Sequence, residues 1–254
     1  MSTALRCRHL TVTYGGHTAL RDVDLDLPRG AVTAIIGPNG SGKSTLLAAL
    51  AGVLTPTTGE VEVLGGRPAS KRRQLAFVLQ TTVANWAVPL TVRETVRMGA
   101  YGRRGAFAPL RAEDRAAVEE AMDRLDIRDL ADRQLVELSG GQRQRAYVAQ
   151  GLAQRADVLL LDEAITGLDL VSLDTIDEVI RAEAAAGRTV VLTTHDVGTA
   201  GEADHVVLLA TELVAAGNPA QALQPELLAQ AYGGDAHQML DGTLIIDEGH
   251  DHHR

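Results

Sequence analysis

The chain has 254 residues, of which 45% are hydrophobic, so it is long enough for one large α/β domain or for a domain that carries a subdomain. Its net charge of −9 argues against a nucleic-acid-binding protein that depends on a basic patch. We therefore expect no nucleic-acid partner. The single cysteine, Cys7, fits a reducing compartment, and no apolar run approaches the roughly 20 residues of a membrane span, so we expect a cytoplasmic protein.

The first part of the chain predicts strands followed by a glycine-rich loop. Residues 3–27 alternate apolar and polar side chains on either side of Gly15-Gly16, which is typical of two antiparallel strands joined by a turn. These strands predict an N-terminal antiparallel β subdomain. Further along, we expect a buried strand over Ala31–Ile36, a helix over Lys43–Leu54, and strands over Glu60–Leu64 and Leu75–Leu79.

The middle of the chain changes to helical periodicity. Apolar residues recur at helical spacing over 91–101 and 111–126, so we interpret residues 81–150 as an inserted α-helical subdomain. Apolar strands return at 157–163 and 188–194, and this alternation indicates an α/β fold with a mostly parallel core sheet. The remaining residues predict a closing hairpin over 204–217, a helix over 219–232 and a flexible tail over Glu248–Arg254.

The glycine-rich segment that follows the strand Ala31–Ile36 has the pattern of a phosphate-binding loop, G-x-x-x-x-G-K-[ST]. Glycines let the backbone N–H groups wrap the phosphates, and the next helix adds its positive N-terminal end. Lys43 can reach the β- and γ-phosphates, and the Ser44 hydroxyl can bind Mg²⁺. By itself the pattern predicts only the binding of a nucleoside triphosphate, and the family resemblance given below implies a P-loop NTPase (RecA-like) core. The predicted phosphate-binding residues are Gly37, Pro38, Asn39, Gly40, Ser41, Gly42, Lys43, Ser44 and Thr45.

Two carboxylates, Asp162 and Glu163, follow the apolar run Val158–Leu161. They therefore lie at the carboxyl end of a buried strand, where ligands bind in open parallel sheets. We predict that Asp162 holds Mg²⁺, directly or through water, and that Glu163 polarises the attacking water. The alternative is that both acids are merely solvated, which the upstream P-loop disfavours.

Between these motifs lies Leu138-Ser139-Gly140-Gly141-Gln142, followed by a helix that we expect over Gln142–Leu152. Two glycines at a helix start leave backbone N–H groups open to an anion. The alternative is an ordinary helix cap at Ser139. Taken alone, the segment favours the cap, but its place between a P-loop and an acid-ended strand favours phosphate binding.

The three motifs in this order closely resemble those of the ABC ATPases, over roughly residues 5–215. The resemblance implies ATP and Mg²⁺ as ligands and assigns further roles. Tyr14 would stack on adenine, with a core aromatic as the alternative. Gln80 would contact Mg²⁺ or water and sense the coupling subunit. Asp169, in Gly167-Leu168-Asp169, would lie at a dimer interface, and His195 would lie near the γ-phosphate.

In this family the nucleotide lies between the P-loop of one subunit and the signature of the other. Ser139, Gly140, Gly141 and Gln142 would therefore serve the ATP of the partner in a head-to-tail homodimer. We expect one ABC ATPase domain over 1–254. Its parts would be a nucleotide-binding core (1–80 and 151–217), a helical subdomain with the signature (81–150), and a C-terminal helix with a histidine-containing tail (218–254).

Two departures from the family pattern lie beside catalytic positions. Ala164-Ile165 replaces the usual Pro-Thr, and Leu79 stands where proline is frequent before Gln80. Neither change removes a catalytic group, so we expect an active ATPase.

The segment from Gln80 to Val92, with Trp86, and the following Met98–Gly102 resemble the subfamily that drives zinc, manganese or iron uptake. This resemblance implies an integral membrane permease and, indirectly, an extracytoplasmic metal-binding protein as partners. The subunit would then lie on the cytoplasmic face of the cell membrane. Open alternatives are a siderophore or haem importer, an exporter and a non-transport ABC ATPase. A further alternative is a P-loop kinase or GTPase with no role in transport. The tail histidines His250, His252 and His253 would bind Zn²⁺ weakly or be solvated.

Overall fold

The computed structural model describes residues 2–79, 89–105, 108–164, 168–233, 236–238 and 244–246. Its core sheet has the spatial order β5 (Leu75–Val78), β6 (Val158–Leu161), β7 (Thr189–Thr193), β3 (Val32–Ile36), β8 (His205–Ala210) and β9 (Glu212–Gly217). The first five strands run parallel, and β9 runs antiparallel to β8. The mostly parallel sheet and the closing hairpin predicted from the sequence are therefore confirmed.

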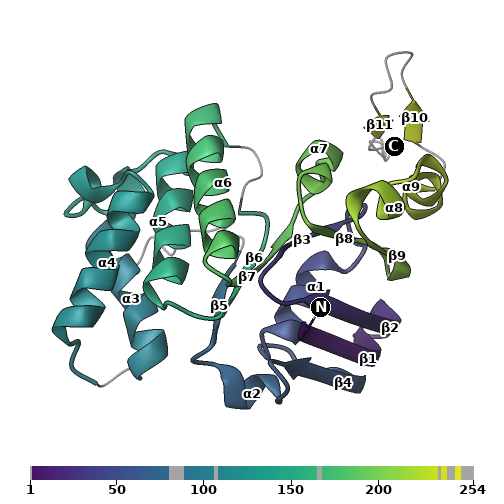
Figure 1. Cartoon of the computed structure of the whole chain (residues 1–254), viewed down its shortest axis with the longest axis horizontal. Coiled ribbons are helices and arrows are strands. Elements are labelled where there is room, and N and C mark those ends of the chain that lie inside the picture. Colours follow the sequence, from purple (N-terminus) through teal and green to yellow (C-terminus); the bar gives the residue numbers. More distant parts are fainter. Residues whose placement is uncertain are drawn as a thin grey trace.

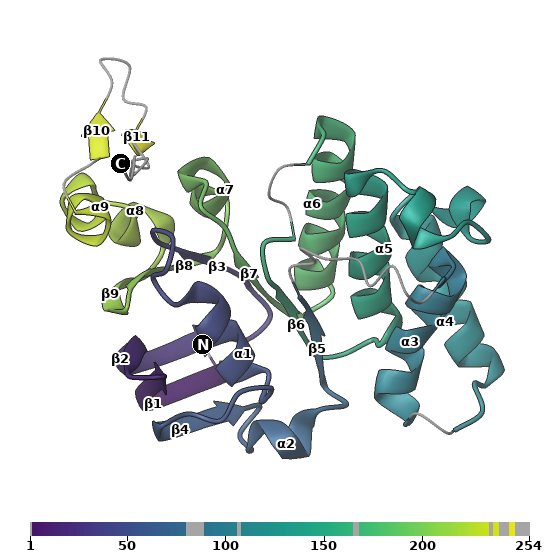
Figure 2. The same ribbon diagram turned by 180° about the vertical axis from the view of Figure 1, so that it is seen from behind.

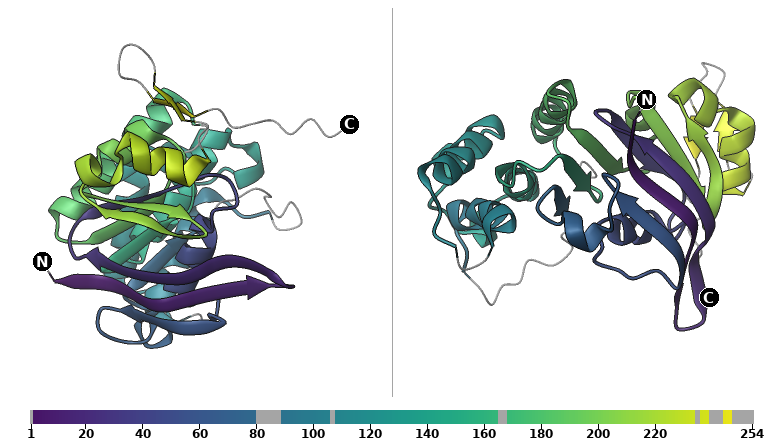
Figure 3. Two further views of the ribbon diagram at one scale, coloured as in Figure 1. Left: turned by 90° about the vertical axis from the view of Figure 1, so that its right-hand side faces the viewer. Right: turned by 60° about the horizontal axis from the view of Figure 1, so that its bottom comes forward.

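A second sheet contains β2 (His17–Pro28), β1 (Thr3–Tyr14) and β4 (Thr58–Val63), all antiparallel. Gly15 and Gly16 form the predicted turn, each with positive φ. Figure 3 (left) shows this sheet as a separate layer at the bottom of the molecule. Its apolar side chains face α1 (Lys43–Leu50) and one face of the core sheet, where they form a shared hydrophobic core.

Helix α1 is shorter than predicted. The sequence predicts a helix as far as Leu54, but α1 ends at Leu50. Gly52 has a φ of +67°, and a Cβ there would lie 2.7 Å from Pro68 Cβ, at the start of α2 (Pro68–Lys71). The chain therefore turns away at Gly52, because a glycine can adopt the left-handed conformation without a clash.

The helical subdomain consists of α3 (Val92–Arg104), α4 (Ala112–Arg124) and α5 (Gly140–Ala153), with short 3₁₀ turns over Arg128–Leu130 and Leu135–Glu137. Figures 1 and 2 show these helices at one end of the molecule, beside α6 (Leu170–Ala185). Helix α3 crosses α5 so closely that a Cβ at Gly99 would lie 1.8 Å from the Gln150 carbonyl oxygen. Both predicted helices, over 91–101 and 111–126, are confirmed.

The end of the chain differs from the sequence prediction. After α7 (Val197–Gly201) and the β8–β9 hairpin, the single helix predicted over 219–232 is two helices, α8 (Pro219–Ala222) and α9 (Pro225–Tyr232). Pro225 is the first residue of α9, and a proline cannot continue the preceding helix. The strands β10 (Ala236–Gln238) and β11 (Leu244–Ile246) then pair antiparallel, which the sequence analysis did not predict. In the described part of the chain, every helix is too short or too polar to cross a lipid bilayer.

Candidate functional site

The glycine-rich loop connects the end of β3 to the first residue of α1, as predicted. Two of its glycines are required by their surroundings. A Cβ at Gly37 would lie 2.0 Å from the Leu209 carbonyl oxygen. Gly42 has a φ of +96°, and a Cβ there would lie 2.5 Å from the Ala19 carbonyl oxygen. The backbones of β8 and β2 therefore pack against the loop at these two glycines and hold it in position.

This loop forms the floor of a cavity of about 290 Å³. Lys43 Nζ donates hydrogen bonds to the carbonyl oxygens of Gly37, at 2.7 Å, and Pro38, at 3.0 Å, so its cation lies over the loop. The Ser41 hydroxyl is buried and has no hydrogen-bond partner within the described residues, which suits a site for an oxygen-rich anion. The cavity is lined by Tyr14, His17, Ala19, Asn39, Gly40, Ser41, Gly42, Lys43, Ser44, Thr45 and Glu163.

Asp162 lies at the end of β6, buried beside the start of α1. Its Oδ1 accepts a hydrogen bond from the Ser44 hydroxyl at 3.0 Å and another from the Thr193 hydroxyl at 2.8 Å. The fold therefore brings together Ser44 and Asp162, two of the three residues predicted to bind Mg²⁺, and the third, Gln80, lies outside the described residues. Thr193 was not predicted, although its position at the end of the adjacent parallel strand β7 is a usable signal.

Glu163 is half-buried, and its side chain lines the cavity. Its φ is +48°, which is unusual for a residue with a side chain, and its backbone N–H donates to Thr193 Oγ1 at 2.8 Å. Because strained backbone conformations concentrate at functional sites, this geometry is consistent with a catalytic glutamate. His195 follows Thr193 by two residues and has an exposed side chain that does not line the cavity.

Tyr14 ends β1 at the rim of the cavity and is 48% exposed. The alternative prediction, that Tyr14 is a core aromatic, is therefore wrong. His17 pairs with Tyr14 across the hairpin and also lines the cavity, and the sequence analysis missed it. The strand register relative to Tyr14 is the signal that could have identified it.

The signature segment starts α5, and its N-cap geometry is well defined. Ser139 Oγ accepts from the Gln142 N–H at 3.2 Å, and Gln142 Oε1 accepts from the Ser139 N–H at 3.1 Å. The helix-cap interpretation is therefore correct as a structural description. Ser139 and Gly140 are exposed and do not line the cavity over the P-loop of their own chain, so the cap leaves them free to face another molecule.

Gly141 packs closely against Asp169 and Ser172, at the start of α6. A Cβ at Gly141 would lie 2.3 Å from both Asp169 Oδ2 and Ser172 Oγ. Asp169 caps α6, with Oδ1 accepting from the Ser172 N–H and Oδ2 from the Ser172 hydroxyl, each at 2.9 Å. These hydrogen bonds, that of the backbone N–H first, lower the pKa of Asp169. Ser172 is a further residue that the sequence analysis missed.

Several predicted positions lie outside the described residues: Gln80, Trp86, Ile165, Gly167, and the tail residues His250, His252 and His253.

Comparison with known proteins identifies related chains. The family profile described as ABC transporter matches residues 20–166. The zinc transport system ATP-binding protein TroB of Treponema pallidum is 40% identical over 233 residues, which are 91% of this chain and 87% of TroB. The manganese transport system ATP-binding protein MntA of Synechocystis sp. is 35% identical over 244 residues, which are 93% of this chain and 94% of MntA.

A solved structure of an ATP-binding cassette is also similar to this chain. It is the dimeric cassette MJ0796, in a post-hydrolysis state bound to ADP and Pi. The two sequences are 27% identical, the TM-score is 0.75, and the match covers 85% of this chain and 98% of the MJ0796 chain. The family profile spans the P-loop, the signature and the acid-ended strand, the segments that form or flank the site described above. This chain belongs to the ABC transporter family and is one of its ATP-hydrolysing, nucleotide-binding subunits.

Proposed function

We propose that this ATPase powers the import of a divalent metal ion, zinc or manganese, through a separate permease in the cell membrane. Its relatives TroB and MntA are named as zinc and manganese transport ATP-binding proteins, and each aligns over most of its length with this chain. The subunit would act from the cytoplasmic face of the membrane, and an extracytoplasmic metal-binding protein would deliver the ion to the permease.

ATP would bind in the cavity over the P-loop. The Lys43 ammonium, which the loop carbonyls hold in place, would contact the β- and γ-phosphates, and the buried Ser41 hydroxyl would gain a partner. The exposed ring of Tyr14 at the cavity rim would stack on the adenine. Gln80 would contact Mg²⁺ or water and sense the coupling subunit, as the family resemblance implies.

The donor set beside the P-loop suits Mg²⁺, because it consists of oxygen atoms, the Ser44 hydroxyl and the Asp162 carboxylate, 3.0 Å apart. When bound there, Mg²⁺ would neutralise negative charge on the β- and γ-phosphates. Hydrogen bonds to the Thr193 hydroxyl fix the Asp162 carboxylate and the Glu163 backbone relative to each other. Glu163 would accept the proton of the attacking water, and His195 would contact the γ-phosphate once the dimer closes.

The observation that best supports a composite, two-subunit site is the exposure of the signature. Ser139 and Gly140 lie at a helix start, away from the cavity of their own chain. Leu170 and Val171, directly after Asp169, are 79% and 64% exposed, which is unusual for two consecutive apolar side chains in a water-soluble surface. A head-to-tail second copy would cover these apolar residues and bring Ser139 to the partner nucleotide.

One experiment tests the composite site. Ser139→Arg should leave ATP binding to the monomer intact and block ATP-dependent dimerisation, because the new side chain would occupy the space of the partner phosphate. Ser139→Ala is the matched control, since it removes the hydroxyl and adds no bulk. Labelled-ATP binding and gel filtration measure the two steps, and loss of monomer binding in Ser139→Arg would contradict the assignment.

A second experiment tests the transported ion. A strain that lacks this gene should be starved of zinc or manganese and should grow when that metal is added in excess. Restoration by the wild-type gene and not by Lys43→Ala would tie the growth defect to ATP binding. Rescue only by a siderophore or by haem would replace the proposed substrate with a chelated-iron compound.

A further inference from the structure

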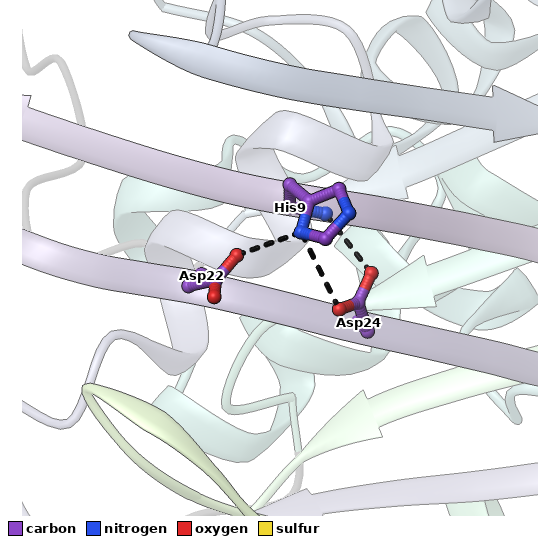
Figure 4. A group of neighbouring side chains, drawn as sticks. All are labelled: His9, Asp22 and Asp24. Atoms are coloured by element: carbon purple, nitrogen blue, oxygen red, sulfur yellow. Dashed lines mark hydrogen bonds and ion pairs between the residues drawn. The ribbon is translucent and has the colours of Figure 1, made fainter.

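A cluster of metal-ligating side chains lies on the outer face of the N-terminal sheet, apart from the nucleotide cavity. His9 on β1 lies opposite Asp22 and Asp24 on β2, and all three side chains are exposed (Figure 4). None of the three lines the cavity over the P-loop. The family resemblance assigns no role to these positions, so they call for a separate explanation.

Strand irregularities bring the three side chains together. The β1–β2 register shifts between Cys7 and Leu10, so His9 lies in a bulge with a φ of +48°. The His9 backbone N–H donates to Asp24 Oδ1 at 3.0 Å, which orients that carboxylate and leaves its Oδ2 on the side of the imidazole ring. The donors thus come from two paired strands, which is a more rigid support than a loop.

Two of the three donor separations are close to those found around a coordinated metal ion. His9 Nδ1 lies 2.9 Å from Asp22 Oδ1 and 3.7 Å from Asp24 Oδ2, and all three donor atoms lie within 4.8 Å of one another. Metal–ligand bonds of about 2.1 Å place neighbouring donors about 3.0 Å apart at 90° and about 3.4 Å apart at a tetrahedral angle. The two separations from His9 Nδ1 bracket these values, and the shorter one is a hydrogen bond that a metal ion would replace.

The surrounding charges also favour a cation. Arg6 and Arg8, the neighbouring cations on β1, both pair with Asp26. Within the described residues, neither Asp22 nor Asp24 forms an ion pair with an arginine or lysine. Two carboxylates therefore share one imidazole, so the three side chains together keep a net negative charge even if the imidazole carries a proton.

We propose that His9, Asp22 and Asp24 form a surface site for one divalent transition-metal ion, with Zn²⁺ as the best match. An imidazole nitrogen with two carboxylates suits Zn²⁺ or Mn²⁺, whereas Mg²⁺ and Ca²⁺ prefer oxygen ligands alone. Three protein donors leave coordination positions for water, so the ion exchanges with solvent. By joining β1 to β2 in the native state only, the ion stabilises the N-terminal sheet by mass action.

The first test is zinc titration of the full-length protein by calorimetry. Asp24→Asn keeps the shape of the side chain and an acceptor for the His9 N–H, but it removes the charge of a ligand. The matched control is Asp26→Asn, which removes one carboxylate from the same strand outside the cluster. We expect Asp24→Asn to weaken one class of zinc sites by at least about tenfold, as for other disturbed metal sites, and Asp26→Asn to retain it. Equal zinc binding by the two variants would overturn the proposal.

A second measurement uses the wild-type chain, so it does not depend on the folding of a variant. Substoichiometric Mn²⁺ should broaden the NMR signals of the His9 ring and of its β1 and β2 neighbours, through paramagnetic relaxation. Broadening of other histidines alone would contradict the site. Because neither test measures ATP hydrolysis or transport, a failure here is distinct from a failure of the proposed transport function.

Discussion

Thr193 lies 2.8 Å from Asp162, its hydroxyl donating to Oδ1 at the end of the adjacent strand. The Thr193 hydroxyl oxygen in turn accepts a hydrogen bond from the backbone N–H of Glu163 at 2.8 Å. One buried hydroxyl therefore holds both the predicted Mg²⁺ ligand and the predicted water-activating residue. It acts on the site from β7, the strand that leads to His195.

Thr193→Val should reduce ATP turnover and raise the Mg²⁺ concentration that is needed for half-maximal activity. The isosteric valine removes the hydroxyl that donates to the buried Asp162 carboxylate and accepts the Glu163 N–H, and losing a hydrogen bond to a charged group costs about 1–3 kcal/mol. Thr193→Ser keeps the hydroxyl and should stay near wild type. Steady-state hydrolysis across a Mg²⁺ titration measures the effect, and identical curves for the two variants would assign Thr193 to packing alone.

Glu163→Gln should retain ATP binding and lose about 10²- to 10⁴-fold in turnover, because the amide cannot accept a proton from water. Gel filtration with ATP should show a trapped dimer. Hydrolysis close to the wild-type rate would move the general base elsewhere, with His195 as the next residue to substitute.

Gly141→Ala should destabilise the protein by about 1–3 kcal/mol, which is typical of overpacking. The new Cβ would lie 2.3 Å from Asp169 Oδ2, a carboxylate that is held by its own helix cap. Gly140→Ala is the matched control, because nothing lies within 4 Å of a Cβ at Gly140. Denaturant unfolding compares the two. Equal stability would show that Asp169 and Ser172 can move aside.

The ionised carboxylate of Asp114 should contribute to the free energy of unfolding, and this contribution should be lost in acid. Burial alone would raise its pKa, but hydrogen bonds from Arg103, the Arg111 backbone and Arg104 outweigh burial and lower the pKa to about 2. Because the folded-state pKa lies below the ordinary value of 3.8, the contribution is complete above pH 3.8 and is lost as the pH falls towards 2.

Asp114→Asn should therefore lower the free energy of unfolding at pH 7 by about 1–3 kcal/mol, the usual contribution of hydrogen bonds to a charged group. It should also flatten the dependence of stability on pH in the acid range. Asp129→Asn, at an exposed position in the same subdomain, controls for the loss of a carboxylate. A wild-type acid dependence in Asp114→Asn would assign the acid sensitivity to other carboxylates.

Local rules explain which features were predictable. The phosphate-binding loop, the acid-ended strand and the antiparallel hairpin each depend on residues that are close in the chain, so spacing alone predicts them. Local rules also explain two errors in the predicted helices, which a closer reading of the sequence would have avoided. Gly52 ends α1 and Pro225 divides the predicted C-terminal helix, and both residues are known helix breakers.

The sequence by itself determined the motifs, their order and the type of sheet, because periodicity and turn residues act within a few positions. Only the tertiary structure decided which distant residues meet. Thr193 reaches Asp162 because β6 and β7 are paired, Gly141 meets Asp169 because α5 starts beside α6, and His9 faces Asp22 through a strand bulge. Such contacts depend on strand register and on the distance between helices, and these are set by packing of the whole core.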